Sequence, residues 1–464
     1  MRPLALGLVL VLSACAVGPD YVKPETHAPQ MWGEKVDTSA ADLSRWWTVF
    51  KDPALEKLIG DALEGSYDLK IAGARMKESR ANLGIASGAL LPEVDLTGIA
   101  ARERLSANGF RVPGQSLYQD RYAAAFEASW EIDLFGGVRR SIEAAAADYE
   151  ASIEFRQAVQ VSLLGEVARN YVGLRGQQRL RAVLRQNLDS ARSTRDLIQA
   201  RIRAGLANDF DLARAESLVA NAEAQLPPIE TALKQSVHRL GVLLGREPRA
   251  LVAELEKEAP IPGAPATIVV GLPSDLLLRR PDVREAERRA AAATARVGVA
   301  TADLYPRFSL TGAFGLSSLN SSDFFDTASR VWIVGPTVRW PIFAGGRIRA
   351  NIEAADARQE EALLNYERSV LVALEEVENT LVAYLREWDR RKSVTAAVDA
   401  DKRAAALSDD LYKKGLAGFL EVLESQRNLY VTQAELARSE AGVSLALVAL
   451  YRALGGGWEP PVAK

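Results

Sequence analysis

Residues 122–134 read Tyr-Ala-Ala-Ala-Phe-Glu-Ala-Ser-Trp-Glu-Ile-Asp-Leu, and they show the clearest alternation of apolar and polar side chains in the sequence. Every second residue, from Tyr122 to Leu134, is apolar or aromatic. The acidic residues all belong to the other set: Glu127, Glu131 and Asp133. Successive side chains of a β-strand point to opposite faces of its sheet. The stretch therefore predicts a strand with one apolar face and one wet face. These carboxylates either keep that face solvated or, if the strand belongs to a pore, line its lumen and favour cations.

Three more stretches alternate in the same way, at 92–101, 307–316 and 330–342, although Ile99 interrupts the pattern in the first. A strand of about ten residues crosses a bilayer when it is tilted. Tryptophan and tyrosine on the apolar faces are typical of the aromatic girdle of a transmembrane barrel. A half-buried antiparallel sheet in a soluble domain also alternates, so that alternative stays open at this point.

Four strands cannot close a barrel. In lipid, an open edge leaves unpaired N–H and C=O groups, each of which costs several kcal/mol. The smallest membrane barrels have about eight strands. If these segments cross the membrane, several chains must therefore pool their strands, and the physical argument alone does not choose between two chains and three.

The chain is an internal duplication, because short motifs recur in the same order along its two halves. Matching pairs are Ala81-Asn82-Leu83-Gly84 with Ala295-Arg296-Val297-Gly298, Trp130 with Trp340, Gly136 with Gly346, Arg139 with Arg349, and Gly205-Leu206-Ala207 with Gly415-Leu416-Ala417. A unit of about 210 residues is far longer than a solenoid repeat. Repeat 1 is predicted at 53–260 and repeat 2 at 261–464.

Each repeat is predicted to run helix, two strands, long helix, turn and helix. The first helices are expected over 53–88 and 274–303, and the long helical hairpins over about 138–246 and 347–455. At about 1.5 Å per residue, the long helices of these hairpins would each be near 100 Å. Pro227 and Pro228 are expected to break or kink the first returning helix.

The N-terminus reads as a lipoprotein signal. Residues 1–14 contain an apolar run too short to span a bilayer, followed by Leu12-Ser13-Ala14-Cys15. Small residues before a cysteine match the site cut by a lipoprotein signal peptidase, so Cys15 is predicted to be the acylated first residue of a segment covering 15–52. Several acyl chains give stable anchoring where one is marginal. An ordinary signal peptide with an incidental cysteine is the alternative.

Composition excludes several classes of function. Among 464 residues there are two histidines and one cysteine, which cannot build a disulfide framework or a Cys/His zinc site. The net charge of −3 gives no field for nucleic acid. No nucleotide-binding loop or nucleophile motif is present. We therefore expect no catalytic residues, no metal and no cofactor.

Three motifs of the chain resemble those of a known family. The motifs are Gly18-Pro19-Asp20-Tyr21 after Cys15, Trp46-Trp47-Thr48-Val49-Phe50, and the segment 271–287 with Arg279-Arg280-Pro281-Asp282. They are similar to the TolC-like outer-membrane factors, specifically the NodT-type efflux lipoproteins. From the residues alone, the mixed charges of 279–296 read as a solvated helix face.

The resemblance implies an α+β membrane protein of the Gram-negative outer membrane, lipid-anchored and extending into the periplasm. It implies a homotrimer with a twelve-stranded transmembrane β-barrel, four strands per chain, continued by a periplasmic α-helical tunnel. The implied partners are outer-membrane lipid, a periplasmic adaptor (membrane fusion) protein and an inner-membrane RND pump. The implied function is a passive exit duct for drugs or small toxic compounds.

The resemblance also assigns a periplasmic gate. Its leucine ring and acidic ring fall on Leu420 and Glu424, and its latch residues on Tyr412 and Lys413. The family has Asp at the second ring and Arg in the latch, so Glu424 and Lys413 are departures. Lysine replaces a bidentate group by a point charge. Arg214, the repeat mate of Glu424, is a candidate salt-bridge partner.

The helix-turn tips are the expected docking surface for the adaptor. Gly205 and Gly415 supply the positive φ that ends each long helix. Leu206 and Leu416 follow them, either as exposed apolar contacts for a partner or folded back onto their own helix. A protein-export duct of similar build, and a soluble periplasmic scaffold, remain alternative functions.

Overall fold

The structure is a computed structural model that describes residues 16–25, 28–39, 42–108 and 116–459, apart from the side chain of Leu277. The predicted signal peptide and Cys15 lie outside the described residues. The chain divides into two compact units. Unit 1 comprises Met1–Glu25, Arg75–Ile153 and Glu285–Glu367, and unit 2 comprises Thr26–Ala74, Glu154–Arg284 and Arg368–Lys464.

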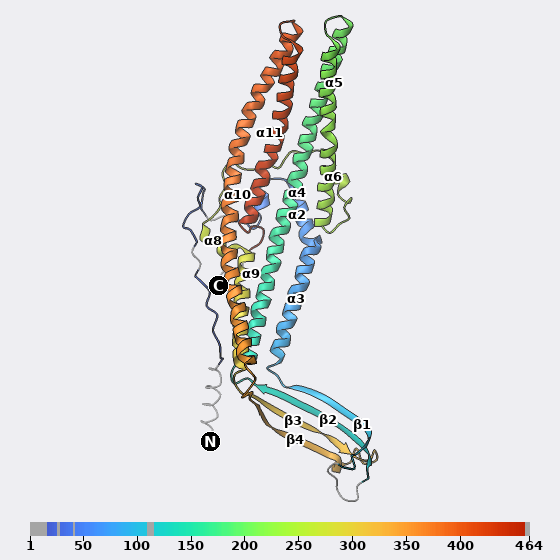
Figure 1. Ribbon diagram of the computed structural model, residues 1–464, viewed down its shortest axis with the longest axis vertical. Helices are drawn as coiled ribbons and strands as arrows, with labels where there is room; N and C mark the ends of the chain where they lie inside the picture. The colour runs from blue at the N-terminus through green and yellow to red at the C-terminus, as the bar shows by residue number, and fades with distance from the viewer. Residues whose placement is uncertain (1–15, 26–27, 40–41, 109–115, 460–464) are drawn as a thin grey trace. The chain divides into compact units, whose positions relative to one another are not determined.

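Unit 1 contains one sheet of four antiparallel strands in the order β1-β2-β3-β4 (Figure 1). The strands are β1 (Glu93–Arg104), β2 (Tyr118–Ile132), β3 (Arg307–Ser318) and β4 (Arg330–Arg339). The ladder between β1 and β2 extends to the pair Arg104 and Tyr118, so both strands run further toward their connecting loop than their predicted bounds of 92–101 and 122–134. β4 ends three residues before the predicted 342.

Asp133 corrects one expectation. It follows the end of β2, and its carboxylate accepts hydrogen bonds from the backbone N–H groups of Val138 (3.1 Å) and Arg139 (2.9 Å). Because its side chain is largely buried and caps the first turn of a helix, Asp133 is not a lumen-lining carboxylate. Glu127 and Glu131 remain on the strand itself.

The register places apolar residues in rows across the whole sheet. Leu96 pairs with Phe126, Phe126 with Phe314, and Phe314 with Trp332. These four side chains remain exposed, with fractions of 69%, 57%, 59% and 73%. The neighbouring rows on the opposite face carry Asp95 beside Glu127 and Ser129 beside Thr311. The sheet therefore presents an uncovered apolar face and a more polar face, as the alternation predicts.

The two repeats use the same contact at the helix-proximal end of the sheet. The Trp130 indole N–H donates to the carbonyl of Leu90 (2.9 Å), and that of Trp340 donates to the carbonyl of Leu304 (3.1 Å). Leu90 lies just before β1, the partner strand of β2, and Leu304 lies just before β3, the partner strand of β4. The polar edge of an indole is thus satisfied while its apolar body stays exposed, as at a membrane interface.

Two helices of 67 residues each run through both units, α4 (Gly137–Arg203) and α10 (Arg347–Lys413). The glycines within α4 do not interrupt the helix. One of them, Gly176, is needed for close packing against a neighbouring helix. A Cβ on Gly176 would lie only 2.6 Å from the Cβ of Ala441, which is shorter than any allowed contact between two carbon atoms. Gly176 therefore lets α4 approach its neighbour, whereas Gly173 has open space where its Cβ would be.

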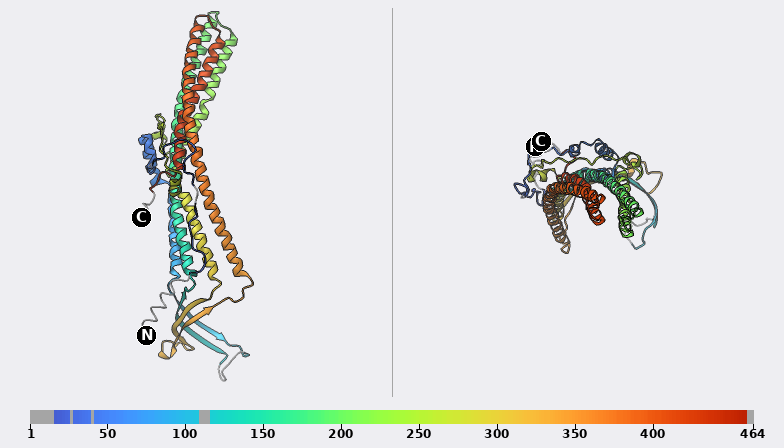
Figure 2. Two further views of the ribbon diagram at one scale, coloured as in Figure 1. Left: turned by 90° about the vertical axis from the view of Figure 1, so that its left-hand side faces the viewer. Right: turned by 90° about the horizontal axis from the view of Figure 1, so that it is seen from above.

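The long hairpin helices of unit 2 form a curved layer (Figure 2). α4 packs on α11 (Phe419–Ala453) through Leu180, Leu184 and Ala437. The first returning arm consists of α5 (Asp209–Ala224) and α6 (Leu226–Leu243), separated at Gln225. Pro227 and Pro228 stand in the first turn of α6, where a missing N–H is tolerated, so the predicted break is confirmed.

The first helix of each repeat is broken once. Pro281 suits the first position of a helix and Arg279-Arg280 suit the end of a preceding short helix, so the sequence predicts the break in repeat 2 but not the one in repeat 1. The expected helix 53–88 consists of α2 (Pro53–Gly65) and α3 (Tyr67–Gly88), and the expected 274–303 of α8 (Pro273–Arg279) and α9 (Pro281–Ala302). Ser66 and Arg280 stand at the breaks with extended ψ angles of 128° and 118°. A Cβ on Gly65 would lie 2.1 Å from the carbonyl oxygen of Leu244, so only glycine lets the last residue of α2 approach the end of α6 this closely.

The core of unit 2 also contains the segment before α2. Trp46 and Trp47 lie in the 3-10 helix η1 (Trp46–Phe50) and are buried, and Trp46 stacks on Tyr451 at a centroid distance of 5.4 Å. Two short elements complete the chain, α7 (Val252–Leu255) in unit 2 and η2 (Thr327–Ser329) in unit 1. In the part of the chain that the structure describes, no helix is both long and apolar enough to cross a membrane.

Candidate functional site

The two hairpin turns of unit 2 have the same backbone geometry. Gly205 and Gly415 have φ angles of +73° and +74°. The N–H of Gly205 donates to Ile202 O (2.9 Å) and that of Leu206 to Arg201 O (2.8 Å). Gly415 and Leu416 donate to Tyr412 O (3.0 Å) and Leu411 O (2.9 Å). Both turns are therefore Schellman motifs, which require a left-handed residue that glycine adopts without strain.

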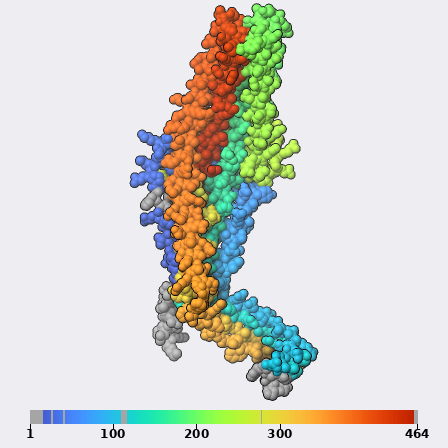
Figure 3. Space-filling model, viewed as in Figure 1, coloured from blue at the N-terminus to red at the C-terminus, as the bar shows by residue number. Residues whose placement is uncertain are grey.

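The leucines after these glycines do not fold back into a buried contact. Leu206 is 66% exposed and Leu416 is 73% exposed. Phe210, at the start of the returning helix of the first hairpin, is 62% exposed. The space-filling view shows the two hairpin ends side by side (Figure 3). Three large apolar side chains thus face solvent at the tips.

A small core joins the two hairpins just behind the turns. It contains residues from four helices: Ile198 on α4, Ala215 on α5, Tyr412 on α10, and Phe419 and Val422 on α11. The rings of Tyr412 and Phe419 are 5.8 Å apart. The hairpins are therefore packed on each other within a single chain, before any second copy is considered.

Arg201 holds Tyr412 in this core. Its guanidinium lies 4.3 Å from the centre of the Tyr412 ring, and its Nη1 donates to the Tyr412 carbonyl oxygen (3.2 Å). Burial raises the pKa of the Tyr412 phenol above its usual value, while Arg201 acts in the opposite direction. The phenol is therefore neutral at physiological pH, and the contact is a cation–π pair between the two hairpins.

The other latch residue behaves differently. Lys413 is exposed, and its Nζ pairs with the Asp409 carboxylate one turn earlier on the same helix (2.6 Å). Lys414 makes the equivalent pair with Asp410 (2.6 Å). Exposed pairs of this spacing contribute only about 0.3–0.5 kcal/mol. Within one chain, Lys413 thus gives no link between the hairpins.

The two gate positions lie one turn apart on α11. Leu420 is 45% exposed, and Glu424 is exposed as well. Among the described residues, no salt bridge joins Glu424 to Arg214, which corrects the pairing suggested by their repeat relation. The Arg214 guanidinium instead lies 4.1 Å from the centre of the Phe210 ring on its own helix.

Arg201 and Phe210 are functional candidates that the sequence patterns do not single out. A signal existed for Phe210, because it is the repeat mate of Leu420, as Arg214 is of Glu424. Arg201 had no signal beyond the favourable position of a cation in the last turn of a helix. Its role depends on a contact with a residue more than two hundred positions away.

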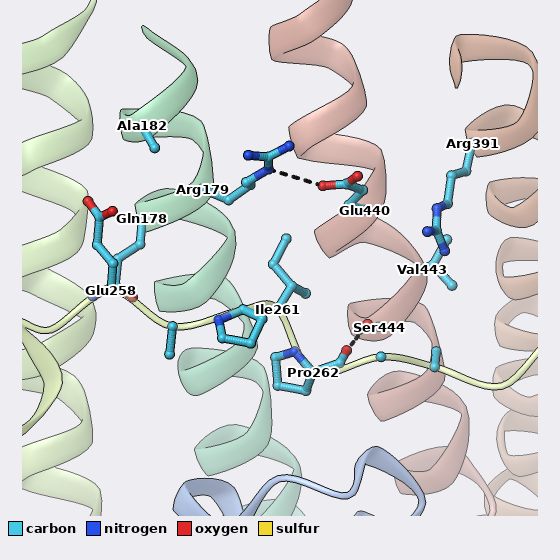
Figure 4. A pocket seen from close by; sticks show the side chains of 14 residues that line it. Gln178, Arg179, Ala182, Glu258, Ile261, Pro262, Arg391, Glu440, Val443 and Ser444 are labelled. Atoms are coloured by element: carbon cyan, nitrogen blue, oxygen red, sulfur yellow. Dashed lines mark hydrogen bonds and ion pairs between the residues drawn. The ribbon is translucent and has the colours of Figure 1, made fainter. Parts of the chain in front are cut away.

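A recess of about 610 Å³ lies where the segment after α7 crosses α4 and α11 (Figure 4). The Pro262 carbonyl oxygen accepts from Ser444 (2.6 Å), and Arg175 donates to the Lys257 carbonyl oxygen (2.8 Å). Arg179 and Glu440 pair across its wall at 3.4 Å. These contacts tie down the segment that links the repeats. Within the described residues, no cluster of three metal-ligating side chains occurs here or elsewhere.

Comparisons with known proteins agree with this architecture. Residues 58–246 and 272–456 match the family described as outer membrane efflux protein. The chain is 33% identical to nodulation protein T of Rhizobium leguminosarum bv. trifolii, over 98% of this chain and 97% of that protein. It is 32% identical to the toluene efflux pump outer membrane protein TtgI of Pseudomonas putida, over 98% of each chain.

Solved structures give the same result. The outer-membrane channel OprN is 35% identical, with a TM-score of 0.90 over 96% of this chain and 100% of that one. An exposed apolar sheet, long helical hairpins and full-length similarity to efflux channels thus converge. The chain belongs to the outer membrane efflux protein family, and it is the outer-membrane component of an efflux system in a Gram-negative bacterium.

Proposed function

We propose that three copies of the chain form a twelve-stranded barrel in the outer membrane. The observation that carries this proposal is the apolar row Leu96, Phe126, Phe314 and Trp332, exposed on a sheet whose edge strands β1 and β4 have no partner among the described residues. In lipid the apolar row is favourable, but open edges are not. Pairing β4 of one copy with β1 of the next removes every edge, and a trimer gives twelve strands, within the range of known membrane barrels.

The long helices continue the barrel as a periplasmic tunnel, and cargo passes through the assembly as through a passive duct. We assign the partners as a periplasmic adaptor and an inner-membrane RND pump, and the cargo as drugs or small toxic compounds. A relative's name, toluene efflux pump outer membrane protein, supports an apolar small-molecule cargo. The exposed Leu206 and Leu416, with Gly205 and Gly415 shaping their turns, support the tips as the surface that receives the adaptor.

Leu420 and Glu424 form the gate of this duct, with Tyr412 and Lys413 beside it. Leu420 and Glu424 lie one turn apart on α11, so in a trimer they produce one apolar ring and one acidic ring. Glu424 is free of Arg214, so three carboxylates would face one another near the axis. Like charges repel, and cations that bridge them would favour the closed form.

The domain organisation is a signal peptide over 1–14, a lipidated segment over 15–52 that begins at Cys15, repeat 1 over 53–260 and repeat 2 over 261–464. The two stretches matched by the family description, 58–246 and 272–456, fall one in each repeat and support this division. The acyl groups on Cys15 would hold the N-terminus in the outer membrane.

The decisive experiment for the trimer uses a Cys15→Ser variant that keeps a cleavable signal peptide. Without its acyl groups this protein should still require detergent, and native mass spectrometry should give three chains per particle. A freely dissolved single chain in plain buffer would overturn the barrel.

Single-channel recording tests the gate. Glu424→Ala should raise the conductance and weaken block by divalent cations, because it removes the acidic ring. Asp409→Ala, which removes only the partner of Lys413, is the matched control and should leave cation block unchanged. If Glu424→Ala has the conductance and cation block of the wild type, Glu424 does not belong to the gate.

A further inference from the structure

The first described residues form a distinct feature of unit 1. Residues 16–21 lie against α4 and α9, and the N–H of Val17 donates to the carbonyl oxygen of Phe135 (3.1 Å), in the turn between β2 and α4. The Tyr21 hydroxyl donates to Glu287 on α9 (2.7 Å). The Tyr21 ring packs on Ala147 of α4 and on Ala291 and Ala292 of α9. We call residues 16–21 the strap.

Arg140, in the first turn of α4, depends on the strap for most of its hydrogen bonds. Its side chain is only 5% exposed. Nε donates to Val17 O (3.2 Å), and Nη2 to Gly18 O (3.4 Å) and to the Asp20 carboxylate (2.6 Å). Its other partner is Glu143 on its own helix (2.8 Å). A buried guanidinium is costly unless its donors are satisfied. The strap satisfies most of the donors of Arg140, and without the strap these donors would lose their partners.

Glycines provide the space for this contact. Gly18 has a φ of +89°, and a Cβ there would lie 2.4 Å from Cα of Gly298. A Cβ on Gly298 would lie 2.8 Å from Cγ of Arg140, and one on Gly136 would lie 2.7 Å from Cα of Ala16. Three glycines in three separate segments therefore allow the strap to reach the backbone of unit 1.

Tyr21 is held by charge as well as by packing. Burial alone would raise the pKa of Glu287, but hydrogen bonds from Arg288 and Tyr21 outweigh it and keep that pKa below its usual value. The Arg288 guanidinium lies 5.8 Å from the centre of the Tyr21 ring. Glu287 is therefore an ionised acceptor for the tyrosine, not part of a solvated helix face as its sequence context indicates.

The duplication supplies an internal control. Arg140 of repeat 1 has Ala350 as its repeat mate, and Glu287 and Arg288 of repeat 2 have Gly73 and Ala74. Gly346 and Gly84, the repeat mates of Gly136 and Gly298, have nothing within 4 Å of where a Cβ would be. Both repeats share the helical frame, but the residues that bind the strap have no counterparts at their repeat-mate positions.

We propose that α4 and α9 carry a built seat for the strap, with Arg140 as its positioning residue, and that the seat fixes the point beside the β2–α4 turn from which the lipid tether starts. The proposal rests on the acylation of Cys15 proposed above, and it adds a defined attachment point on the protein body. A flexible linker would leave the tether free to leave from any side of the channel. A seated strap makes the tether of each copy start beside its own β2–α4 turn.

Hydrogen–deuterium exchange of the full-length protein in detergent tests the seat. In Arg140→Ala, amides of the peptide 16–25 should exchange on the order of tenfold faster or more, because charged hydrogen bonds are lost. Arg349→Ala, on the equivalent turn of repeat 2 where the side chain is exposed, is the matched control and should leave this peptide unchanged. Arg140→Lys should recover part of the protection, since a point charge can still pair with Asp20.

Gly18→Ala tests the seat from the strap side and leaves α4 and α9 intact. It should release the peptide to the same extent, while exchange in α4 and α9 beyond the seat stays at the wild-type rate. Equal protection of 16–25 in wild type, Arg140→Ala and Gly18→Ala would overturn the seat. The mass of the N-terminal peptide reports separately on the lipid: an unacylated Cys15 would overturn the proposed anchor, whatever the exchange shows.

Discussion

The two hairpin tips have the same backbone and different side chains. Gly205 and Gly415 differ by 1° in φ, and each turn makes the same pair of hydrogen bonds. One turn into the returning helices, however, the first hairpin presents Phe210 and Arg214, stacked on each other, while the second presents Leu420 and Glu424. The same two positions are thus aromatic and cationic in repeat 1 and aliphatic and acidic in repeat 2.

The returning arms differ as well. α5 and α6 are separated at Gln225, whereas α11 continues unbroken for 35 residues. Backbone geometry at a turn is dictated by steric limits that both copies share. The side chains on the flanking helices are not limited in this way and can differ between the two repeats, so each hairpin makes its own contacts. Exchanging residues between the repeats, or removing a contact that only one of them makes, tests this division.

The largest effect is expected at the breaks in the first helices, where repeat 1 has Ser66 and repeat 2 has Arg280. The Arg280 side chain is buried and pairs with Asp282 (2.6 Å), Glu376 (2.6 Å) and the Ala453 carbonyl oxygen (3.0 Å). Arg280→Ser, which copies repeat 1, should cost about 3 kcal/mol, because it removes charged hydrogen bonds to Asp282 and Glu376 and the donor to the Ala453 carbonyl oxygen. The midpoint of thermal unfolding in detergent measures it, and the exposed Arg403→Ser is the control. Equal midpoints for both variants would contradict this account of the break.

A second effect concerns the packing of α4 against α11. Gly176→Ala should destabilise the protein by roughly 1–3 kcal/mol, because its Cβ would collide with Ala441. Gly173→Ala, one turn away in open space, should be neutral or stabilising by up to about 1 kcal/mol. The thermal midpoint should fall in Gly176→Ala and should stay unchanged or rise in Gly173→Ala. A Gly176→Ala midpoint at or above that of Gly173→Ala would refute the close approach.

A third effect separates the two members of the latch. Arg201→Ala removes a cation–π contact and a hydrogen bond to Tyr412, and should weaken the junction of the hairpins by about 1–2 kcal/mol. Lys413→Ala should cost no more than about 0.5 kcal/mol. Hydrogen exchange in the peptides around Ile198 and Val422 reports on this junction. Faster exchange in Lys413→Ala than in Arg201→Ala would reverse the assignment.

The smallest effect is expected at the broken arm. Replacing Pro227 by Ala and Pro228 by Arg, the residues at the repeat-mate positions on α11, should let α5 and α6 join. Exchange across residues 222–229 should slow severalfold, because the restored N–H groups bond within the helix. Overall stability should change by less than about 1 kcal/mol, since the arm is exposed at this point. Unchanged exchange would show that packing around Gln225, not proline, makes the break.

Local patterns were sufficient to predict much of the fold. Alternation in 122–134 correctly assigned the apolar face of β2, and the glycines at 205 and 415 correctly marked the turns. Both signals depend on the residue itself and its nearest neighbours. The bounds of the strands were less accurate, because the pairing of Arg104 with Tyr118 depends on a partner strand. The break at Ser66 was missed because the carbonyl of Leu244, which abuts Gly65, is distant in sequence.

The class of molecule follows from the order of side chains along the chain, because that order carries the period of the strands, the length of the helices and the duplication. Which charged residues have specific partners depends on tertiary packing. Arg140, Arg201 and Arg280 look alike as surface arginines in the sequence, yet each is drawn into contacts with segments tens to hundreds of residues away. A side chain's burial and partners are properties of the space around it, and that space exists only after the helices and strands have packed.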